Sequence, residues 1–198
     1  GGNAFWSCDG LTSVTLGDGV SAVGEAAFKD CSFLTDLDLG NGVTSIGDSA
    51  FSDCTGLTDV AIPDSVTYIG DYAFRGCISL SGANLGNGVA YIGDSAFEES
   101  GLTSIEIPDS VTEMGTYTFL RCYSLTSAKL GNGMSVTGKN AFSGCISLTD
   151  VEFGSGIQAV GEYTFANTGL KNFLLPEGVT EIETGAFYKC SELTEISF

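Results

Sequence analysis

Apolar and polar residues follow one another along this chain in a fixed order. Residues 34–54, LTDLDLGNGVTSIGDSAFSDC, show the order once: leucines in the spacing L-x-x-L-x-L, a turn, Val and Ile, and then Ala-Phe and Cys. The L-x-L alternation predicts a short strand with one buried face, because successive side chains of a strand point to opposite sides. The polar residues between the leucines are therefore expected on an outward face.

Phenylalanine marks the period of this pattern most clearly. It recurs every 22 or 23 residues along the chain, at Phe5, Phe28, Phe51, Phe74, Phe97, Phe119, Phe142, Phe165 and Phe187. Repeats of this length are typical of solenoids, in which each unit buries its apolar face against its neighbours. The spacing predicts one domain over 1–198, with about eight complete units of 22–23 residues and partial units at both ends. Because the sequence starts and stops inside a unit, we expect it to be part of a longer chain.

The corners of the unit have two forms. Some units carry Gly-Asn-Gly, as at 40–42, and others carry Pro-Asp-Ser, as at 63–65. Both combinations favour tight turns, because Gly allows positive φ and Pro fixes φ near about −65°. Further on, Asp48 precedes Ala50 and Phe51, and an acceptor at such a position predicts the cap of a short helical turn. Successive strands are expected to be parallel, with right-handed crossovers.

These motifs together resemble the BspA-like class of leucine-rich repeats. The elements L-x-x-L-x-L, V-x-x-I-G and A-F-x-x-C carry the resemblance, which covers the entire chain. It implies an α/β repeat solenoid that is right-handed, with a parallel β-sheet on the concave side and short helical or irregular segments on the convex side. It also implies a non-enzymatic binding module of a secreted or cell-surface protein that adheres to host proteins, matrix or glycans.

All seven cysteines occupy one slot of the repeat, and two units carry Ser100 or Thr168 there instead. The sharper interpretations of such a set are disulfide bonds or a metal site. The odd number of cysteines, the absence of C-x-x-C and of His, and the two hydroxyl substitutions favour a column of buried thiols. No cofactor is expected from this chain.

The charge balance narrows the possible partners. The chain has 25 acidic and 7 basic residues, no His, and a formal net charge of −18. Nucleic acid is excluded because phosphate neutralisation needs clusters of Lys and Arg. An anionic membrane surface is disfavoured for the same reason, and no apolar run reaches the length of a membrane span, so direct insertion is not expected. The partners that remain compatible with this charge are basic proteins, cations and neutral glycans.

The acidic residues sort by their position in the repeat. Some lie in corners or beside the Ala-Phe element, whereas others fall on the outward face of the strands. Within that outward set, the predicted ligand-binding residues are Asp36, Asp38, Asp59, Glu106, Asp150 and Glu152. Lys129 is the basic residue at these strand positions. Like charges on neighbouring strands repel, so this face is either a solvated surface or the site of a cationic partner. Calcium binding at this face stays a possible interpretation, since oxygen ligands are present but a recognised calcium-binding loop is not.

A tyrosine recurs two residues before the Phe, at Tyr72, Tyr117 and Tyr163. These side chains are either half-buried packing on the convex side or a stripe that contacts sugar or peptide. Catalytic chemistry is not indicated: the sequence has no His, no G-x-S-x-G and no P-loop. Every cysteine falls in the core column, where a thiol nucleophile has no base.

Two functions from different classes fit the sequence. The first is recognition of a host or matrix protein or a glycan by the acidic strand face, at the cell surface or outside the cell. The alternative is a structural spacer or an element that associates end to end. The alternative is motivated by the lack of a polar capping unit, because an exposed sheet edge invites pairing with another chain.

Overall fold

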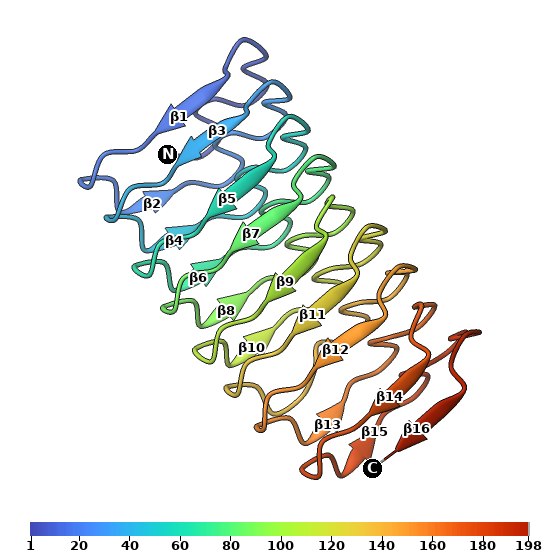
Figure 1. Cartoon of the computed structure of the whole chain (residues 1–198). Helices are drawn as coiled ribbons and strands as arrows, with labels where there is room; N and C mark the ends of the chain where they lie inside the picture. Colours follow the sequence, from blue (N-terminus) through green and yellow to red (C-terminus); the bar gives the residue numbers. More distant parts are fainter. Residues whose placement is uncertain (198) are drawn as a thin grey trace.

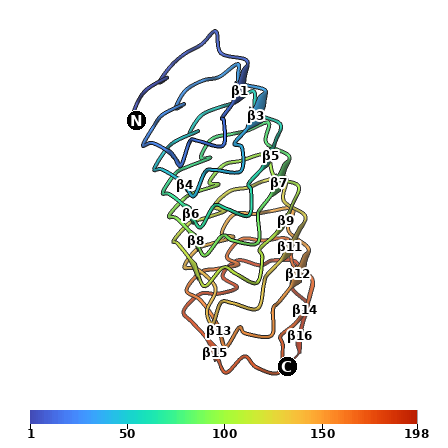
Figure 2. The ribbon, with the colours of Figure 1, turned by 90° about the vertical axis from the view of Figure 1, so that its left-hand side faces the viewer.

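The structure, a computed structural model, describes residues 1–197 and is a stack of similar coils. Each coil places its strands beside those of the preceding coil, and the two termini lie at opposite ends of the stack (Figure 1). The view turned by 90° shows the same elongated stack, with coil following coil from the N-terminal to the C-terminal end (Figure 2). The predicted leucine-rich-repeat solenoid is therefore confirmed.

The L-x-L segments form a first row of parallel strands. Its members are β1 (Ser13–Thr15), β3 (Asp36–Asp38), β5 (Asp59–Ala61), β7 (Gly82–Asn84), β9 (Ser104–Glu106), β11 (Ser127–Lys129), β12 (Asp150–Glu152), β14 (Asn172–Leu174) and β16 (Glu195–Ser197). The strands pair in parallel within four groups, β1–β3, β5–β7, β9–β11–β12 and β14–β16. The central residue of each strand faces the core, and the two flanking residues face outward, as the alternation predicts.

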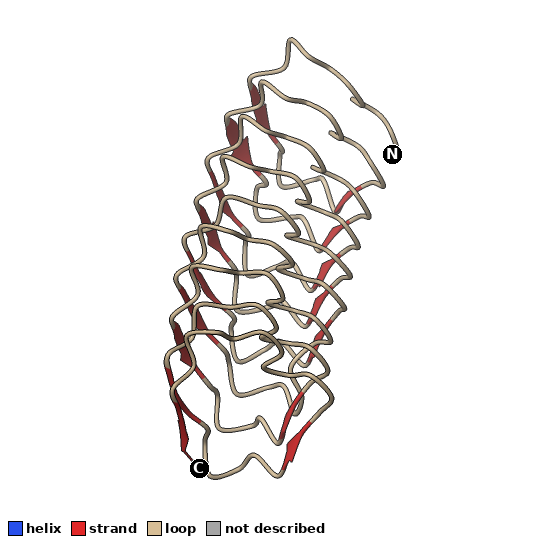
Figure 3. Cartoon of the chain, turned by 90° about the vertical axis from the view of Figure 1, so that its right-hand side faces the viewer, coloured by secondary structure: helices blue, strands red, loops and turns tan. Residues whose placement is uncertain are grey.

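A second row of strands was not expected from the sequence. It consists of two-residue strands: β2 (Ala22–Val23), β4 (Ser45–Ile46), β6 (Tyr68–Ile69), β8 (Tyr91–Ile92), β10 (Glu113–Met114), β13 (Ala159–Val160) and β15 (Glu181–Ile182). The first five pair in parallel, and β13 pairs with β15. The two rows lie on different sides of the coil (Figure 3). Two residues are too few to show alternation, so the sequence predicted only that Val43 and Ile46 point inward.

The helical turn predicted after Asp48 is wrong, and the irregular alternative holds. Residues 1–197 contain no helix (Figure 3). Ser49 has φ 55°, in the left-handed region, so it does not begin a right-handed turn. The Asp48 carboxylate instead accepts a hydrogen bond from the backbone N–H of Asp71 in the next coil, at 3.1 Å. Asp71 in turn accepts from the N–H of Asp94 at 2.8 Å.

The backbone of this irregular segment is also bonded from coil to coil. The N–H of Phe28 donates to the carbonyl of Ala50, and the N–H of Phe51 donates to that of Ala73, both at 2.8 Å. A helical turn would use such groups within one coil. Here they form a third ladder along the stack, so buried backbone groups are satisfied without a helix.

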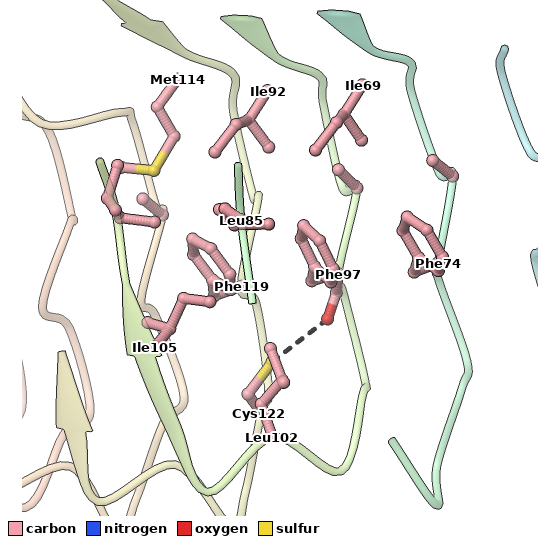
Figure 4. Close-up of a cluster of buried hydrophobic side chains, with 14 of the residues drawn as sticks. Ile69, Phe74, Leu85, Ile92, Phe97, Leu102, Ile105, Met114, Phe119 and Cys122 are labelled. Carbon is pink, nitrogen blue, oxygen red and sulfur yellow. Dashed lines mark hydrogen bonds between the residues drawn. The ribbon is translucent and has the colours of Figure 1, made fainter. Parts of the chain in front are cut away.

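The phenylalanines form a continuous column through the core. Phe51, Phe74 and Phe97 are fully buried, and consecutive rings lie 5.2–5.3 Å apart and nearly parallel. Figure 4 shows Phe74, Phe97 and Phe119 side by side, with Ile69 and Ile92 packed beyond them. Each coil thus buries its ring against the coils before and after it, as the 23-residue period predicts.

The cysteine slot forms a second column with a specific polar role. The Cys54 thiol donates to the carbonyl of Phe28 at 3.1 Å, and the Cys122 thiol donates to that of Phe97 at 3.1 Å (Figure 4). Where Thr168 replaces Cys, its hydroxyl donates to the carbonyl of Phe165 in its own coil, at 2.9 Å. The slot therefore accepts a small polar donor, although the hydroxyl does not reproduce the thiol's bond to the preceding coil. The cysteines of the described chain are free thiols, and five of the seven are buried as predicted. The prediction is wrong for Cys8, which is exposed, and for Cys190, which is half-buried, because both lie in coils at the ends of the stack.

Truncation of one ring in the column is expected to weaken the whole stack. Phe97→Ala should lower the free energy of unfolding by about 3–5 kcal/mol, because it removes contacts with two neighbouring rings and leaves a cavity. Urea denaturation followed by circular dichroism measures this loss. Phe33, whose side chain is 62% exposed, is the control: Phe33→Ala should change the unfolding free energy by less than about 0.5 kcal/mol. Equal losses in both variants would contradict the proposed column.

Buried thiols should make the fold sensitive to alkali. Burial raises the pKa of Cys54 from 9.0 to about 12 and raises that of Cys77 well above its ordinary value. Above pH 9 the unfolded chain loses thiol protons that the folded chain keeps, so the unfolding free energy should fall as pH rises from 9 towards 12. Denaturation at a series of pH values tests this. Cys54→Ser keeps a donor but does not titrate there, so its stability should fall less steeply with pH.

Candidate binding surface

All six predicted acidic residues lie on the outward face of the first row and are exposed. The structure divides them into two groups along the stack. Asp36, Asp38 and Asp59 lie on β3 and β5 near the N-terminal end, and the other three lie on β9 and β12. The predicted placement on the strand face is thus correct, but the six residues do not form a single cluster.

The N-terminal group is held by local hydrogen bonds. The hydroxyl of Thr35 donates to the Asp36 carboxylate at 3.1 Å, and the hydroxyl of Thr58 donates to that of Asp59 at 2.9 Å. The Asp38 carboxylate accepts from the backbone N–H of the corner glycine two residues later, at 2.9 Å. Each carboxylate is therefore oriented by its own coil. In the first row, β3 pairs with β1 and β5 pairs with β7, so the pairing breaks between Asp36 and Asp59.

The C-terminal group surrounds the one basic residue predicted for this face. Lys129 on β11 is in register with Glu106 on β9 and with Glu152 on β12. Its ammonium Nζ lies 2.6 Å from Glu106 Oε1, and this hydrogen bond, with the attraction of the carboxylate, raises the pKa of Lys129. Asp150, beside Glu152 on β12, accepts a hydrogen bond from the Thr149 hydroxyl at 2.8 Å.

A shallow hollow lies over this C-terminal group. It has a volume of about 470 Å³ and is lined by β9, β11 and β12. The first outward position is small in two consecutive strands, at Ser104 and Ser127, and becomes acidic at Asp150 in the next strand, which leaves room for the hollow beside that carboxylate. Carboxylates of Glu106, Asp150 and Glu152 line it together with the Lys129 ammonium.

An adjoining hollow of about 470 Å³ continues from the strand ends onto the corners. There the Asp109 carboxylate accepts hydrogen bonds from the backbone N–H of Asn132 at 2.8 Å and from its side-chain amide at 3.0 Å. These bonds lower the pKa of Asp109. Asn132 accepts in turn from the N–H of Ser155 at 2.7 Å. The corner residues thus present fixed polar groups beside the strand face.

Sequence reasoning did not include these corner residues in the site. Asp109 belongs to a Pro-Asp-Ser corner and Asn132 to a Gly-Asn-Gly corner, and the pattern predicts only a turn at both. A usable signal was present, because each corner directly follows an outward strand residue and therefore lies beside it at the same edge. The small residues Ser104 and Ser127 were the sign of a hollow beside the acidic position Asp150.

Within residues 1–197, no group of three His, Cys, Asp or Glu side chains is arranged to hold a metal ion. The described part of the chain also has no helix that is both long and apolar enough to cross a membrane.

Stacked coils, a parallel row of L-x-L strands and an inward column of leucines and phenylalanines define a leucine-rich-repeat protein. The chain belongs to the BspA-type leucine-rich-repeat family, whose sequence profile matches residues 1–126 and 113–198. This membership confirms the resemblance inferred from the A-F-x-x-C element. No curated protein matches the chain.

Several solved structures share the fold. A leucine-rich cell surface protein from Faecalibacterium prausnitzii is 30% identical, with a TM-score of 0.63 over 100% of this chain and 69% of that protein. A leucine-rich repeat protein from Bacteroides ovatus is 25% identical, with a TM-score of 0.52 over 100% of this chain and 75% of that one. The T. pallidum leucine-rich repeat protein, at 24% identity and a TM-score of 0.59, covers 84% of this chain and 67% of its own.

The ion pair on the strand face can be tested by titration. In the unaltered protein the pKa of the Lys129 ammonium should lie above its ordinary 10.5, because the Glu106 carboxylate stabilises the charged form. Glu106→Gln removes that charge and should return the pKa towards 10.5, as measured by NMR of the lysine side chain. Asp36→Asn removes a charge elsewhere on the face and should leave the Lys129 pKa unchanged. An equal shift of the Lys129 pKa in both variants would show that the overall negative charge of the protein, and not the pair with Glu106, raises it.

Proposed function

We propose that this chain is a non-enzymatic binding module of a cell-surface or secreted protein, and that it recognises a host or matrix protein or a glycan through its strand face. The hollow over β9, β11 and β12 is the proposed centre of that surface. Membership in the BspA-type family and similarity to a protein described as a leucine-rich cell surface protein support the location.

The observation that carries the proposal is the arrangement of polar groups in this hollow. Carboxylates converge there on a rigid sheet, and the Thr149 hydroxyl fixes Asp150 before any partner arrives. Preorganised polar groups reduce the ordering cost of association. The hollow is open and shallow, which fits contact with a protuberance of a macromolecule better than enclosure of a small molecule.

The charges favour a partner that carries a cation at this place. Lys129 is paired with Glu106, which leaves Asp150 and Glu152 with excess negative charge at one side of the hollow. A Lys or Arg side chain of the partner can pair with these carboxylates. The net charge of −18 steers basic partners towards the protein. Such binding should weaken with salt, because exposed charges are screened within about 8–10 Å at physiological ionic strength.

Binding without catalysis also agrees with the chemistry of the chain. The sequence contains no histidine, and the Cys54 thiol is buried with a pKa raised to about 12, far from that of a reactive thiolate. The open strand face offers no enclosed carboxyl that could act as a general acid near neutral pH.

The proposal is tested by charge reversal at matched positions. The protein is screened against immobilised matrix proteins, a glycan array and a lysine-rich peptide, at low and physiological salt. For any partner found, Asp150→Lys with Glu152→Lys should weaken binding by about tenfold or more. Asp36→Lys with Asp38→Lys changes the net charge by the same amount outside the hollow, and its effect should be smaller.

Equal losses in the two double variants would mean that net charge alone drives binding. Unchanged affinity in both would place recognition elsewhere on the molecule. Thermal unfolding of each variant verifies that the fold is retained.

A further inference from the structure

A different hollow lies on the irregular segments that follow the second row, in the C-terminal part of the stack. It has a volume of about 570 Å³ and is widely open to solvent. Tyrosine, asparagine and lysine side chains line it, among them Tyr117, Asn140, Tyr163, Asn167 and Lys189. We call this hollow the tyrosine groove.

The groove exists because the residue after the Phe, which forms its floor, is small in two consecutive coils. This slot holds Ser143 and Ala166 within the groove. In earlier coils the same slot is filled by Arg75 and Glu98, which form an ion pair with 3.2 Å between Nε and Oε2. In the last described coil the slot holds Tyr188, which closes the groove at that end.

The walls of the groove are rigid. The backbone N–H of Asn140 donates to the carbonyl of Glu162 at 2.8 Å, and the N–H of Asn167 donates to that of Tyr188 at 2.7 Å. Both asparagines have φ near 55° and belong to the two columns of left-handed residues that recur in every coil. Asn167 is exposed and Asn140 is half-buried, and both residues line the groove.

Two aromatic rings shape the C-terminal end of the groove. Tyr163 and Tyr188 lie 6.0 Å apart at 89°, so one ring meets the edge of the other. Gly185 makes this possible, because a Cβ at that position would clash with the Tyr163 ring. The Lys189 ammonium lies 5.3 Å from the centre of the Tyr188 ring. Tyr117 is 40% exposed and Tyr163 is half-buried, so part of each side chain is accessible from solvent.

The groove carries basic residues at positions that are acidic in other coils, although the protein as a whole is strongly acidic. The slot before Cys carries Asp30, Asp53 and Glu99 in the N-terminal coils, but Arg121, Asn167 and Lys189 in the C-terminal coils. The slot that holds Asp48, Asp71 and Asp94 earlier holds Lys139 here. Lys139 pairs with Glu162 at 2.6 Å, which neutralises the acid that lines the groove. Lys189 is left as a cation at its rim.

We propose that the tyrosine groove binds a short oligosaccharide that carries carboxylate groups, such as a chain of hexuronic acid residues. The tyrosine rings offer apolar faces for the sugar rings, and the asparagine amides offer both donors and acceptors for sugar hydroxyls. The Lys189 ammonium pairs with a sugar carboxylate. The lining residues come from four coils, and three steps of about 4.8 Å between them give the groove a length of roughly 14 Å, which suits a short oligosaccharide. This site is separate from the acidic strand face and opposite to it in charge preference.

Isothermal titration with tetragalacturonate tests the proposal, with neutral maltotetraose and tetraglutamate as comparison ligands. Tetragalacturonate should bind in preference to both. Tyr163→Ala and Lys189→Glu should each weaken this binding by about tenfold or more. Ser143→Arg places a large side chain in the floor of the groove, as Arg75 does in an earlier coil, and should block the binding of tetragalacturonate. Both charged substitutions use residues that the same slots hold in other coils, so the fold should tolerate them.

Matched controls separate this site from general effects. Tyr72→Ala removes the equivalent tyrosine where the floor is already filled by Arg75, and it should leave tetragalacturonate binding unchanged. Asp150→Lys with Glu152→Lys alters the strand face and should not abolish the binding either, so failure of one site is distinguishable from failure of the other. Absence of binding up to about 10 mM, equal binding of maltotetraose or tetraglutamate, or equal loss in the Tyr72 and Tyr163 variants would overturn the proposal.

Discussion

The contact between each Phe ring and the ring of the next coil is the constraint on which the rest of the structure depends. Neighbouring rings from Phe5 to Phe165 lie 5.0–5.6 Å apart and nearly parallel. Parallel strands stand about 4.8 Å apart, so a slightly offset ring stack matches the rise of the backbone ladders. Because the same rise applies at every slot, side chains of one slot form a column along the molecule. Each surface of this protein therefore consists of columns of side chains, and each column is formed by the residues at one position of the repeat.

Inward slots were predictable from the sequence because a single period governs them. Phe97, Cys54 and Leu57 fall where the repeat places them, and each is buried. The irregular segment was predicted less well. Its left-handed positions hold Ser49 and Tyr72, and neither residue type predicts positive φ as glycine does. The ladder between coils selects that conformation, and a ladder between residues 23 apart leaves no local pattern in the sequence.

The outward slots were predictable in direction but not in arrangement. Alternation placed Asp36 and Glu106 on the strand face, and both are exposed there. It could not show that the sheet pairing is interrupted between Asp36 and Asp59, within the N-terminal group of acidic residues. Nor could it show that Lys129 reaches Glu106, since that contact depends on the conformation of a long side chain. The hollow depends on the absence of bulk at Ser104 and Ser127, which a search for charged residues does not register.

This division between constrained and free slots explains how one small repeat can carry two surfaces of opposite chemistry. Bulk and polarity at the core slots are fixed by the stack, as the replacement of Cys by another small donor at Thr168 shows. The outward strand slots and the floor and rim slots of the irregular segment carry no such requirement. A change there, such as Glu99 in one coil and Lys189 in another, alters the surface without disturbing the ring column. Recognition in such a protein can therefore vary from coil to coil while the fold stays constant, and the two proposed sites occupy different slots of the same repeat for that reason.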